Sequence, residues 1–202
     1  MTVGDRRNTV IVAGHRGDTA VAERHLDDPE PVVRAAALGA LDRIGSLTDD
    51  RVAAAFDDDD AIVRRRAAEL AAARPDVDLM PLVTDDDATV VEMAVWACGE
   101  RDTVSDDLLA VVIDLTTDAD EPLVREAGAA ALGAIGDARG APAVLVACGD
   151  KPHVRRRAVL ALAPFAGDEI EAAIDRALTD RDWQVRQAAE DLRRAAGTVD
   201  LI

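Results

Sequence analysis

The feature that most constrains this chain is a short sequence motif that recurs six times along its 202 residues. The motif consists of an acidic turn, a Val that is usually followed by Arg, a small residue and then an apolar pair. Successive copies lie 27 to 34 residues apart, which is room for two short helices and two turns. The anchor valines of the six copies are Val33, Val63, Val90, Val124, Val154 and Val185.

The spacing within each copy is helical. In the first copy the small residue Ala37 follows the anchor Val33 by four positions, and Ala40 and Leu41 follow it by seven and eight. Offsets 0, 4, 7 and 8 lie on one face of an α-helix. The last copy carries Arg193 at offset 8, so its apolar face is narrower, as expected of a terminal repeat that faces water.

A second set of apolar segments lies between the anchor helices, and glycine or proline separates most of the segments. The pattern predicts an all-α solenoid, or superhelix, of six helix pairs plus an N-terminal half-repeat, with thirteen helices and no strand. The chain is predicted to be one domain, 1–202, that ends in a short tail, 198–202. Its other parts are the half-repeat 1–17 and the repeats 18–45, 46–75, 76–102, 103–137, 138–167 and 168–197.

The segment 28–34, with the sequence DPEPVVR, and its five relatives resemble HEAT-like repeats of the type first associated with phycobilisome lyases. The resemblance extends over nearly the whole chain and implies an α-solenoid. It implies further that the second helix of each repeat lines a concave surface. HEAT-like repeats occur in scaffolds, lyase subunits, hydroxylases and repair enzymes, so the fold alone does not fix the activity.

An arginine follows the anchor valine in five of the six copies, and an aspartate precedes the anchor by about five residues. These arginines form either an anion-binding stripe or a structural ladder. The resemblance to HEAT-like proteins implies the ladder, in which Asp and Arg tie neighbouring repeats together. The third copy carries Val91 in place of the arginine, which predicts a local break in the ladder.

The chain is strongly acidic, with 40 Asp and Glu against 23 Lys and Arg and a formal net charge of −17. Such a charge disfavours nonspecific adhesion to nucleic acid and to anionic membranes. Neither a secretory signal nor an apolar run long enough to span a membrane is found in the sequence. Cys98 and Cys148 lie in apolar helical patterns and are expected to be free thiols. A reducing cytosol is the expected location.

The sequence gives little support for catalysis. His15, His25 and His153 lack the spacing of a helical metal site, and none is followed by the glutamate of the His-Glu dyads on which deoxyhypusine hydroxylase relies. The acidic clusters 57–60 and 85–87 lack the ligand spacing of a calcium loop, and we interpret them as solvated helix caps. We predict no catalytic, cofactor-binding or metal-binding residue, and the case for an enzyme rests on analogy alone.

A candidate binding surface comes from the helical phase of the anchor helices. At 100° per residue, offsets 2, 5, 6 and 9 are expected to point away from the core and to be polar. In repeats three to five, offsets 5 and 6 are apolar instead, which predicts a partner-binding groove with two flanking arginines. Alternatively, tight stacking of the repeats buries these side chains between neighbours. The predicted binding residues are Val95, Trp96, Val159, Leu160, Arg65 and Arg156, and the exposed Trp183 is a second candidate.

The main hypothesis is a noncatalytic scaffold or adaptor that binds an unidentified protein or peptide in this concave groove. One alternative is a lyase-like subunit that handles a tetrapyrrole or its acceptor protein. The other is a HEAT-like alkylation-repair protein that binds DNA. The net charge of −17 and the absence of tyrosine argue against the DNA-binding alternative.

Overall fold

The computed structural model describes residues 1–199, with side chains described to residue 195. Over these residues it contains thirteen α-helices, two short 3-10 turns at Ala55–Asp57 and Ala138–Gly140, and no strand. The predicted all-α solenoid of helix pairs is thereby confirmed. The last helix continues to Val199, two residues into the predicted tail, and the rest of that tail lies outside the described residues.

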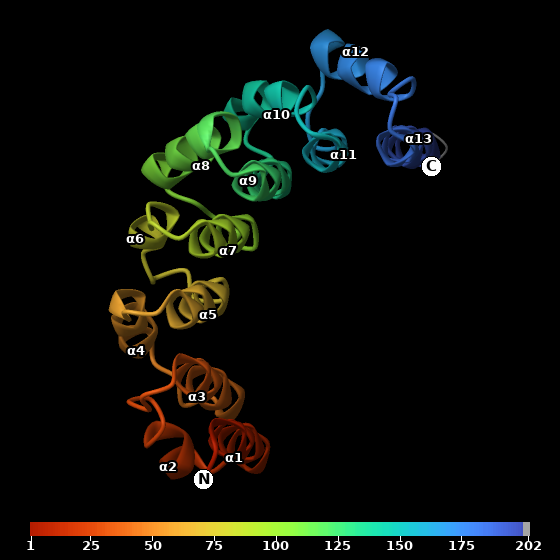
Figure 1. Ribbon diagram of the computed structural model, residues 1–202. Coiled ribbons are helices and arrows are strands. Elements are labelled where there is room, and N and C mark those ends of the chain that lie inside the picture. Colours follow the sequence, from red (N-terminus) through yellow and green to blue (C-terminus); the bar gives the residue numbers. More distant parts are fainter. Residues whose placement is uncertain (200–202) are drawn as a thin grey trace. The chain divides into compact units, whose positions relative to one another are not determined.

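First and second helices alternate along the chain after an initial helix, α1 (Val3–Arg16), which takes the place of a second helix (Figure 1). The first helices are α2 (Thr19–Glu23), α4 (Asp49–Ala54), α6 (Met80–Val83), α8 (Asp106–Asp118), α10 (Ala141–Ala147) and α12 (Asp168–Ala177). The second helices, which contain the anchor valines, are α3 (Pro31–Ile44), α5 (Ala61–Ala71), α7 (Ala88–Gly99), α9 (Pro122–Ile135), α11 (Pro152–Ala161) and α13 (Trp183–Val199). Each of the first five predicted repeats contains one such pair, and α13 extends two residues past the end of the sixth, 168–197.

The chain divides into two compact units, residues 1–97 and 98–202, here called unit 1 and unit 2. The division falls inside α7, between Ala97 and Cys98. One continuous domain over 1–202 stays a prediction.

Local signals in the sequence account for the helix boundaries. The side chains of Thr48 and Ser105 accept hydrogen bonds from the amides of the first turns of α4 and α8. The helices α3 and α9 end at Gly45 and Gly136, whose φ angles of 77° and 68° lie in the left-handed region that favours glycine. The N-cap of α5 is Asp60, which lies two residues after the turn aspartate Asp58.

The core of each unit lies between its first and second helices. The anchor valines are 0 to 3% exposed, and the small residues four positions later are fully buried at Ala37, Ala67, Ala94, Ala158 and Ala189. Small residues let successive second helices approach closely. A Cβ atom added at Gly133 would lie 2.7 Å from the Cα atom of Ala161 in the next second helix, so this contact requires glycine.

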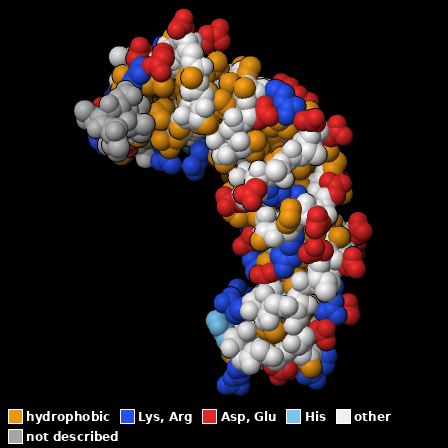
Figure 2. All heavy atoms as spheres, turned by 180° about the vertical axis from the view of Figure 1, so that it is seen from behind, with side chains coloured by type: hydrophobic (Ala, Val, Ile, Leu, Met, Phe, Trp, Pro, Cys, Tyr) orange, Lys and Arg blue, Asp and Glu red, His pale blue; other side chains and the backbone are white. Residues whose placement is uncertain are grey.

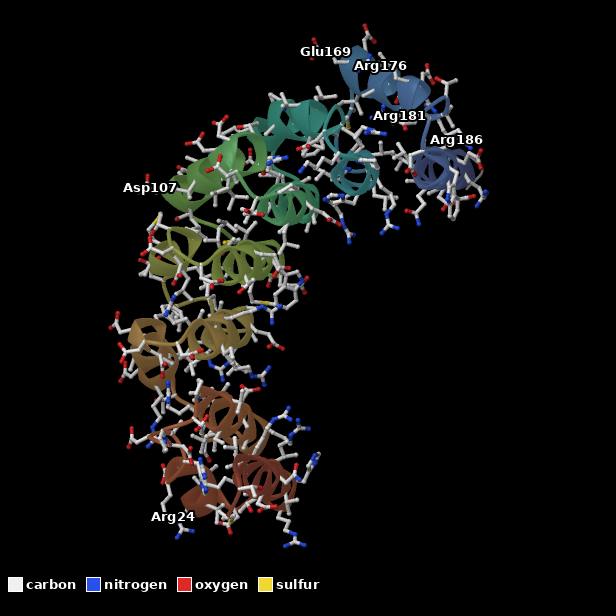
Figure 3. All side chains as sticks on the ribbon, in the orientation of Figure 1. Arg24, Asp107, Glu169, Arg176, Arg181 and Arg186 are labelled. Atoms are coloured by element: carbon white, nitrogen blue, oxygen red, sulfur yellow. The ribbon has the colours of Figure 1, made fainter. Side chains whose placement is uncertain are left out.

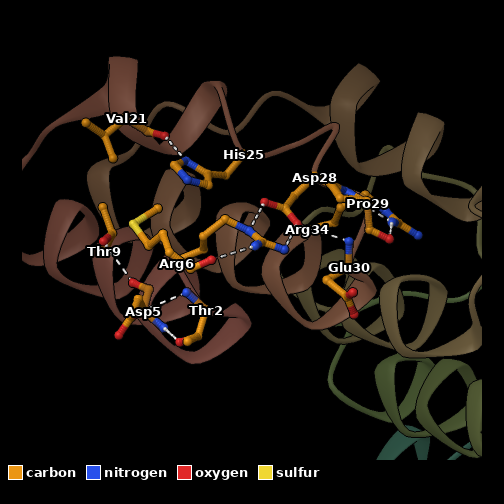
Figure 4. A network of polar contacts seen from close by, with 11 residues as sticks. Thr2, Asp5, Arg6, Thr9, Val21, His25, Asp28, Pro29, Glu30 and Arg34 are labelled. Atoms are coloured by element: carbon orange, nitrogen blue, oxygen red, sulfur yellow. Dashed lines mark hydrogen bonds and ion pairs between the residues drawn. The ribbon is translucent and has the colours of Figure 1, made fainter.

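An arginine–aspartate ladder joins successive repeats within each unit, as the resemblance to HEAT-like repeats implied. Figure 4 shows its first step, in which Arg6 donates two hydrogen bonds, of 2.8 and 3.1 Å, to the Asp28 carboxylate. The same carboxylate accepts a hydrogen bond from the backbone amide of Glu30, and this bond holds the turn in place. Five paired steps are present among the described residues: Arg6–Asp28, Arg34–Asp58, Arg64–Asp85, Arg125–Asp150 and Arg155–Asp180.

The ladder arginines also bind the turn of their own repeat. Arg34 donates to the backbone oxygen of Asp28 at 2.8 Å, and Arg64 donates to that of Asp58 at 2.9 Å. One guanidinium therefore fixes two consecutive turns, which suits its planar set of donors. Val91, at the ladder position of α7, is buried and carries no donor, so the ladder of unit 1 ends at Arg64–Asp85.

Replacing Arg64 by alanine should lower the free energy of unfolding by about 2 kcal/mol, because three charge-assisted hydrogen bonds are lost. The adjacent Arg65 is the matched control. Its guanidinium is partly exposed and lies 3.6 Å from the Glu92 carboxylate, so Arg65→Ala should cost less than about 0.5 kcal/mol. Urea unfolding followed by circular dichroism measures both variants. Equal losses would contradict a structural ladder.

The ladder should also make the stability depend on pH in acid. Hydrogen bonds from arginine hold the pKa values of Asp85, Asp150 and Asp180 below the ordinary value of 3.8. A carboxylate with a depressed folded pKa stabilises the fold above its unfolded pKa, and this contribution is lost as pH falls through the folded pKa. We expect the melting temperature to fall below about pH 4, and to fall less steeply in Asp85→Asn. Thermal melts across this range measure both, and identical profiles for the two proteins would rule out a ladder contribution.

Candidate partner-binding surface

The two helix sets differ sharply in charge. The second helices, with α1, carry fifteen of the 23 basic residues but only seven of the 40 acidic ones. The acidic surplus therefore lies in the first helices and the turns. In Figure 2, carboxylates line the right-hand edge of the lower part, where the first helices of unit 1 lie. Although the chain has a net charge of −17, α1 and the second helices together contain more basic than acidic residues.

Large exposed apolar side chains also gather on the second helices. Nine such residues are present among the described residues, and only Val146 lies on a first helix, while Met1 precedes α1. We call the exposed side chains of α1 and the second helices the second-helix face of each unit. Its large apolar members are Ile11, Val12, Ile62 and Trp96 in unit 1, and Leu123, Leu160 and Trp183 in unit 2.

The structure separates the predicted groove residues into two kinds. Trp96 and Leu160, at offset 6, are each 38% exposed. Val95 and Val159, at offset 5, are 0% and 1% exposed, so the expectation that they face outward is wrong. This corrects the predicted groove, because a buried valine cannot contact a partner without local unfolding.

Helix packing explains the difference between these two offsets. The ladder arginine at offset 1 lies about 100° around the helix from the anchor and points to the next repeat. Offset 5 lies about 140° around, close to that arginine, and within unit 2 this is the direction in which α13 packs on α11 and covers Val159. Offset 6 lies on the opposite side of the helix and stays open. Stacking thus buries half of the predicted apolar stripe, as the alternative interpretation expected.

The predicted flanking arginines lie on the second-helix face. Arg65 on α5 is 3.6 Å from Glu92 on α7, and Glu92 lies one turn before Trp96, so this row belongs to unit 1. In unit 2, Arg156 is half-buried and lies one turn before Leu160 on α11. Each unit therefore holds its own arginine and its own exposed apolar residue.

The sequence interpretation missed two exposed apolar residues, Ile62 and Leu123, which are 48% and 44% exposed. Both directly precede an anchor valine, at offset −1. That offset lies about 20° from offset 6 on a helix, so the same angular argument identifies it. The signal was present in the sequence but lay outside the four offsets considered.

Histidine, cysteine and carboxylate side chains are the usual protein ligands of a metal ion. Among the described residues no group of three or more His, Cys, Asp or Glu is placed to hold a metal ion. His25 contacts the backbone oxygen of Val21 at 2.8 Å, within its own helical segment. Cys98 and Cys148 are free, and burial raises the pKa of each thiol to about 11, which keeps both thiols protonated at neutral pH.

Comparison with known proteins agrees with this architecture. Residues 48–133 and 77–153 match the family model of HEAT repeats, and together these matches span more than half of the chain. The chain therefore belongs to the HEAT-repeat family. No curated protein matches it. No helix within the described residues is long and apolar enough to cross a membrane.

Solved structures give weaker likenesses. One is the crystal structure of an engineered protein, with 22% identity and a TM-score of 0.46, covering 92% of this chain and 85% of that one. Another is human deoxyhypusine hydroxylase in complex with glycerol, with 15% identity and a TM-score of 0.37, covering 87% and 83%. With TM-scores below 0.5, neither likeness supports a functional assignment.

Adjacent residues on α11 test the helical phase directly. Val159→Asp should lower the free energy of unfolding by about 3 kcal/mol or more, because it buries a carboxylate with no partner. Leu160→Asp places the same group at an exposed position and should cost less than about 1 kcal/mol. Urea unfolding of both variants is the measurement. A larger loss for Leu160→Asp would show that the assignment of buried and open sides is reversed.

Proposed function

We propose that this protein is a noncatalytic scaffold or adaptor that binds a partner protein or peptide on its second-helix face. The observation that carries the proposal is the distribution of exposed apolar side chains, which gather on the second helices and α1 and are nearly absent from the first helices. Exposed apolar surface that is segregated in this way is typical of interaction sites. Membership of the HEAT-repeat family supports a scaffold fold.

Trp96 is the proposed anchor in unit 1. It is the only aromatic residue of its helix, and its indole ring is large, rigid and partly open to solvent. Tryptophan is enriched among residues that dominate binding energy at interfaces. The neighbouring pair Arg65–Glu92 supplies charges of both signs beside the ring, as in the polar rim of an interface.

In unit 2 the corresponding proposed contacts are Leu160 and Arg156 on α11. Leucine at this position gives apolar area without an aromatic anchor, so we expect a smaller contribution to binding than from Trp96. The proposal places the protein in a reducing cytosol, which its free thiols fit.

Trp96→Ala should weaken the complex with the native partner by about 2 kcal/mol or more, close to thirtyfold in affinity. The experiment captures partners from the native cell with wild-type and variant baits in parallel, and then measures the captured partner by isothermal titration. Val146→Ala is the control, because Val146 is 62% exposed but lies on α10, a first helix outside the second-helix face.

The expected result is that Trp96→Ala loses the partner and Val146→Ala retains it, with thermal melts close to wild type for both variants. Unchanged affinity in Trp96→Ala would contradict the proposal. A sharp fall in the melting temperature of Trp96→Ala, with unchanged binding per folded molecule, would show that the indole ring is part of the core instead.

A further inference from the structure

A pocket opens on the second-helix face of unit 1, where α3 packs between α1 and α5 (Figure 1). Its volume of about 330 Å³ lies at the small end of the range for ligand pockets, which suits one or two side chains. The lining residues on α3, here called the pocket floor, lie between an arginine on α1 and an isoleucine and an arginine on α5. The lining residues are Arg7, Val32, Ala35, Ala36, Ile62 and Arg66.

Gly39 makes room for one of these arginines. A Cβ atom added to this glycine would lie 2.5 Å from Nη2 of Arg66, so the guanidinium rests against the bare backbone of α3. Glycine within a helix makes the helix less stable than alanine does. At this position the glycine leaves a space that the Arg66 side chain fills. The guanidinium is thereby held one turn beyond Ala35 and Ala36, beside the pocket floor.

Both arginines of the pocket can form an ion pair with a negatively charged ligand. The side chain of Arg7 forms no hydrogen bond or ion pair with any described residue, and it is exposed. Arg66 pairs with Glu69 three residues later on the same helix at 2.6 Å, and both side chains are partly exposed. An exposed pair of this kind is worth little, so a carboxylate from a ligand can share or replace Glu69.

The chemistry of the pocket favours a peptide over nucleic acid. Single-stranded nucleic acid is bound by aromatic side chains on which bases stack, and the lining of the pocket contains only aliphatic residues and arginine. Ala35 and Ala36 offer an apolar surface that complements an apolar side chain of a ligand, and the arginines beside them complement a carboxylate. The complementary ligand is therefore both apolar and acidic.

We propose that this pocket binds an acidic segment of a partner protein, with one apolar side chain on the pocket floor and carboxylates paired with Arg7 and Arg66. This inference rests on the proposed scaffold function, because it names the chemistry of the partner on the same face. Trp96 does not line this pocket, so the pocket is a second contact site for the partner, separate from Trp96.

The test uses a defined probe, a fluorescein-labelled, C-terminally amidated pentapeptide with the sequence Glu-Glu-Leu-Glu-Glu, and follows its fluorescence anisotropy on titration with the full chain. Two companion peptides remove one feature each: glutamine in place of every glutamate, or serine in place of leucine. An oligothymidine strand tests for binding of a phosphate polymer. We expect the Glu-Leu probe to bind at least tenfold more tightly than either companion or the oligothymidine strand.

Gly39→Ala is the sharpest variant, because its expected effects on stability and on binding have opposite signs. Alanine favours the helix, so the melting temperature should stay level or rise. The added methyl group moves the Arg66 guanidinium, and probe binding should weaken about fivefold to tenfold. Arg7→Gln should weaken it similarly. Arg24→Gln makes the same charge change at the end of α2, where Figure 3 shows Arg24 directed away from α3 and α5, and should bind as wild type.

Several results would overturn the inference: wild-type probe affinity in both Gly39→Ala and Arg7→Gln, equal affinity for the serine peptide, or tighter binding of oligothymidine. A second copy of this acidic chain as the occupant would appear as a concentration-dependent dimer in light scattering, abolished by Arg7→Gln, and would also overturn it. If Trp96→Ala loses the native partner but the probe fails to bind, the scaffold function stands and this pocket assignment fails.

Discussion

The arginine–aspartate ladder is the interaction on which the rest of this structure depends. Each ladder arginine forms two hydrogen bonds with the carboxylate in the turn of the next repeat, and one or two with backbone oxygens just before its own helix. Because one rigid guanidinium ties consecutive turns together, it sets which side of each second helix the next repeat covers. The opposite side of the helix is left open to solvent.

This packing separates structural residues from the proposed binding residues at the level of single positions. Arg64 belongs to the ladder, while the next residues, Arg65 and Arg66, lie on the second-helix face and form weaker, partly exposed pairs. Val95 lies in the core and Trp96 does not. The acidic residues are concentrated in the turns and the first helices, so α1 and the second helices together have a surplus of basic residues. Five of these basic residues are ladder arginines paired with aspartates, and the others include the two arginines that line the pocket.

Much of the fold could be predicted from the sequence, because the anchor valines, the small residues and the ladder pairs recur at fixed spacing. The open side of each helix could not be predicted fully. A helical period gives the angle of Val159 relative to Val154, but it does not say on which side the next repeat packs. The pocket was also out of reach, since it depends on α3 packing between two helices and on Gly39 facing Arg66. The net charge of the whole chain gives no information on how the charges are divided between the first and the second helices.

Hydrogen exchange measured by mass spectrometry, on the full chain with and without its captured partner, tests the central claim most directly. It reports which helices a partner covers without any substitution in the chain. Binding on the second-helix face predicts slower exchange in segments from α1, α3, α5 and α7, with little change in α2, α4 and α6. Protection confined to the first helices, or spread equally over both sets, would contradict the assignment of the binding surface.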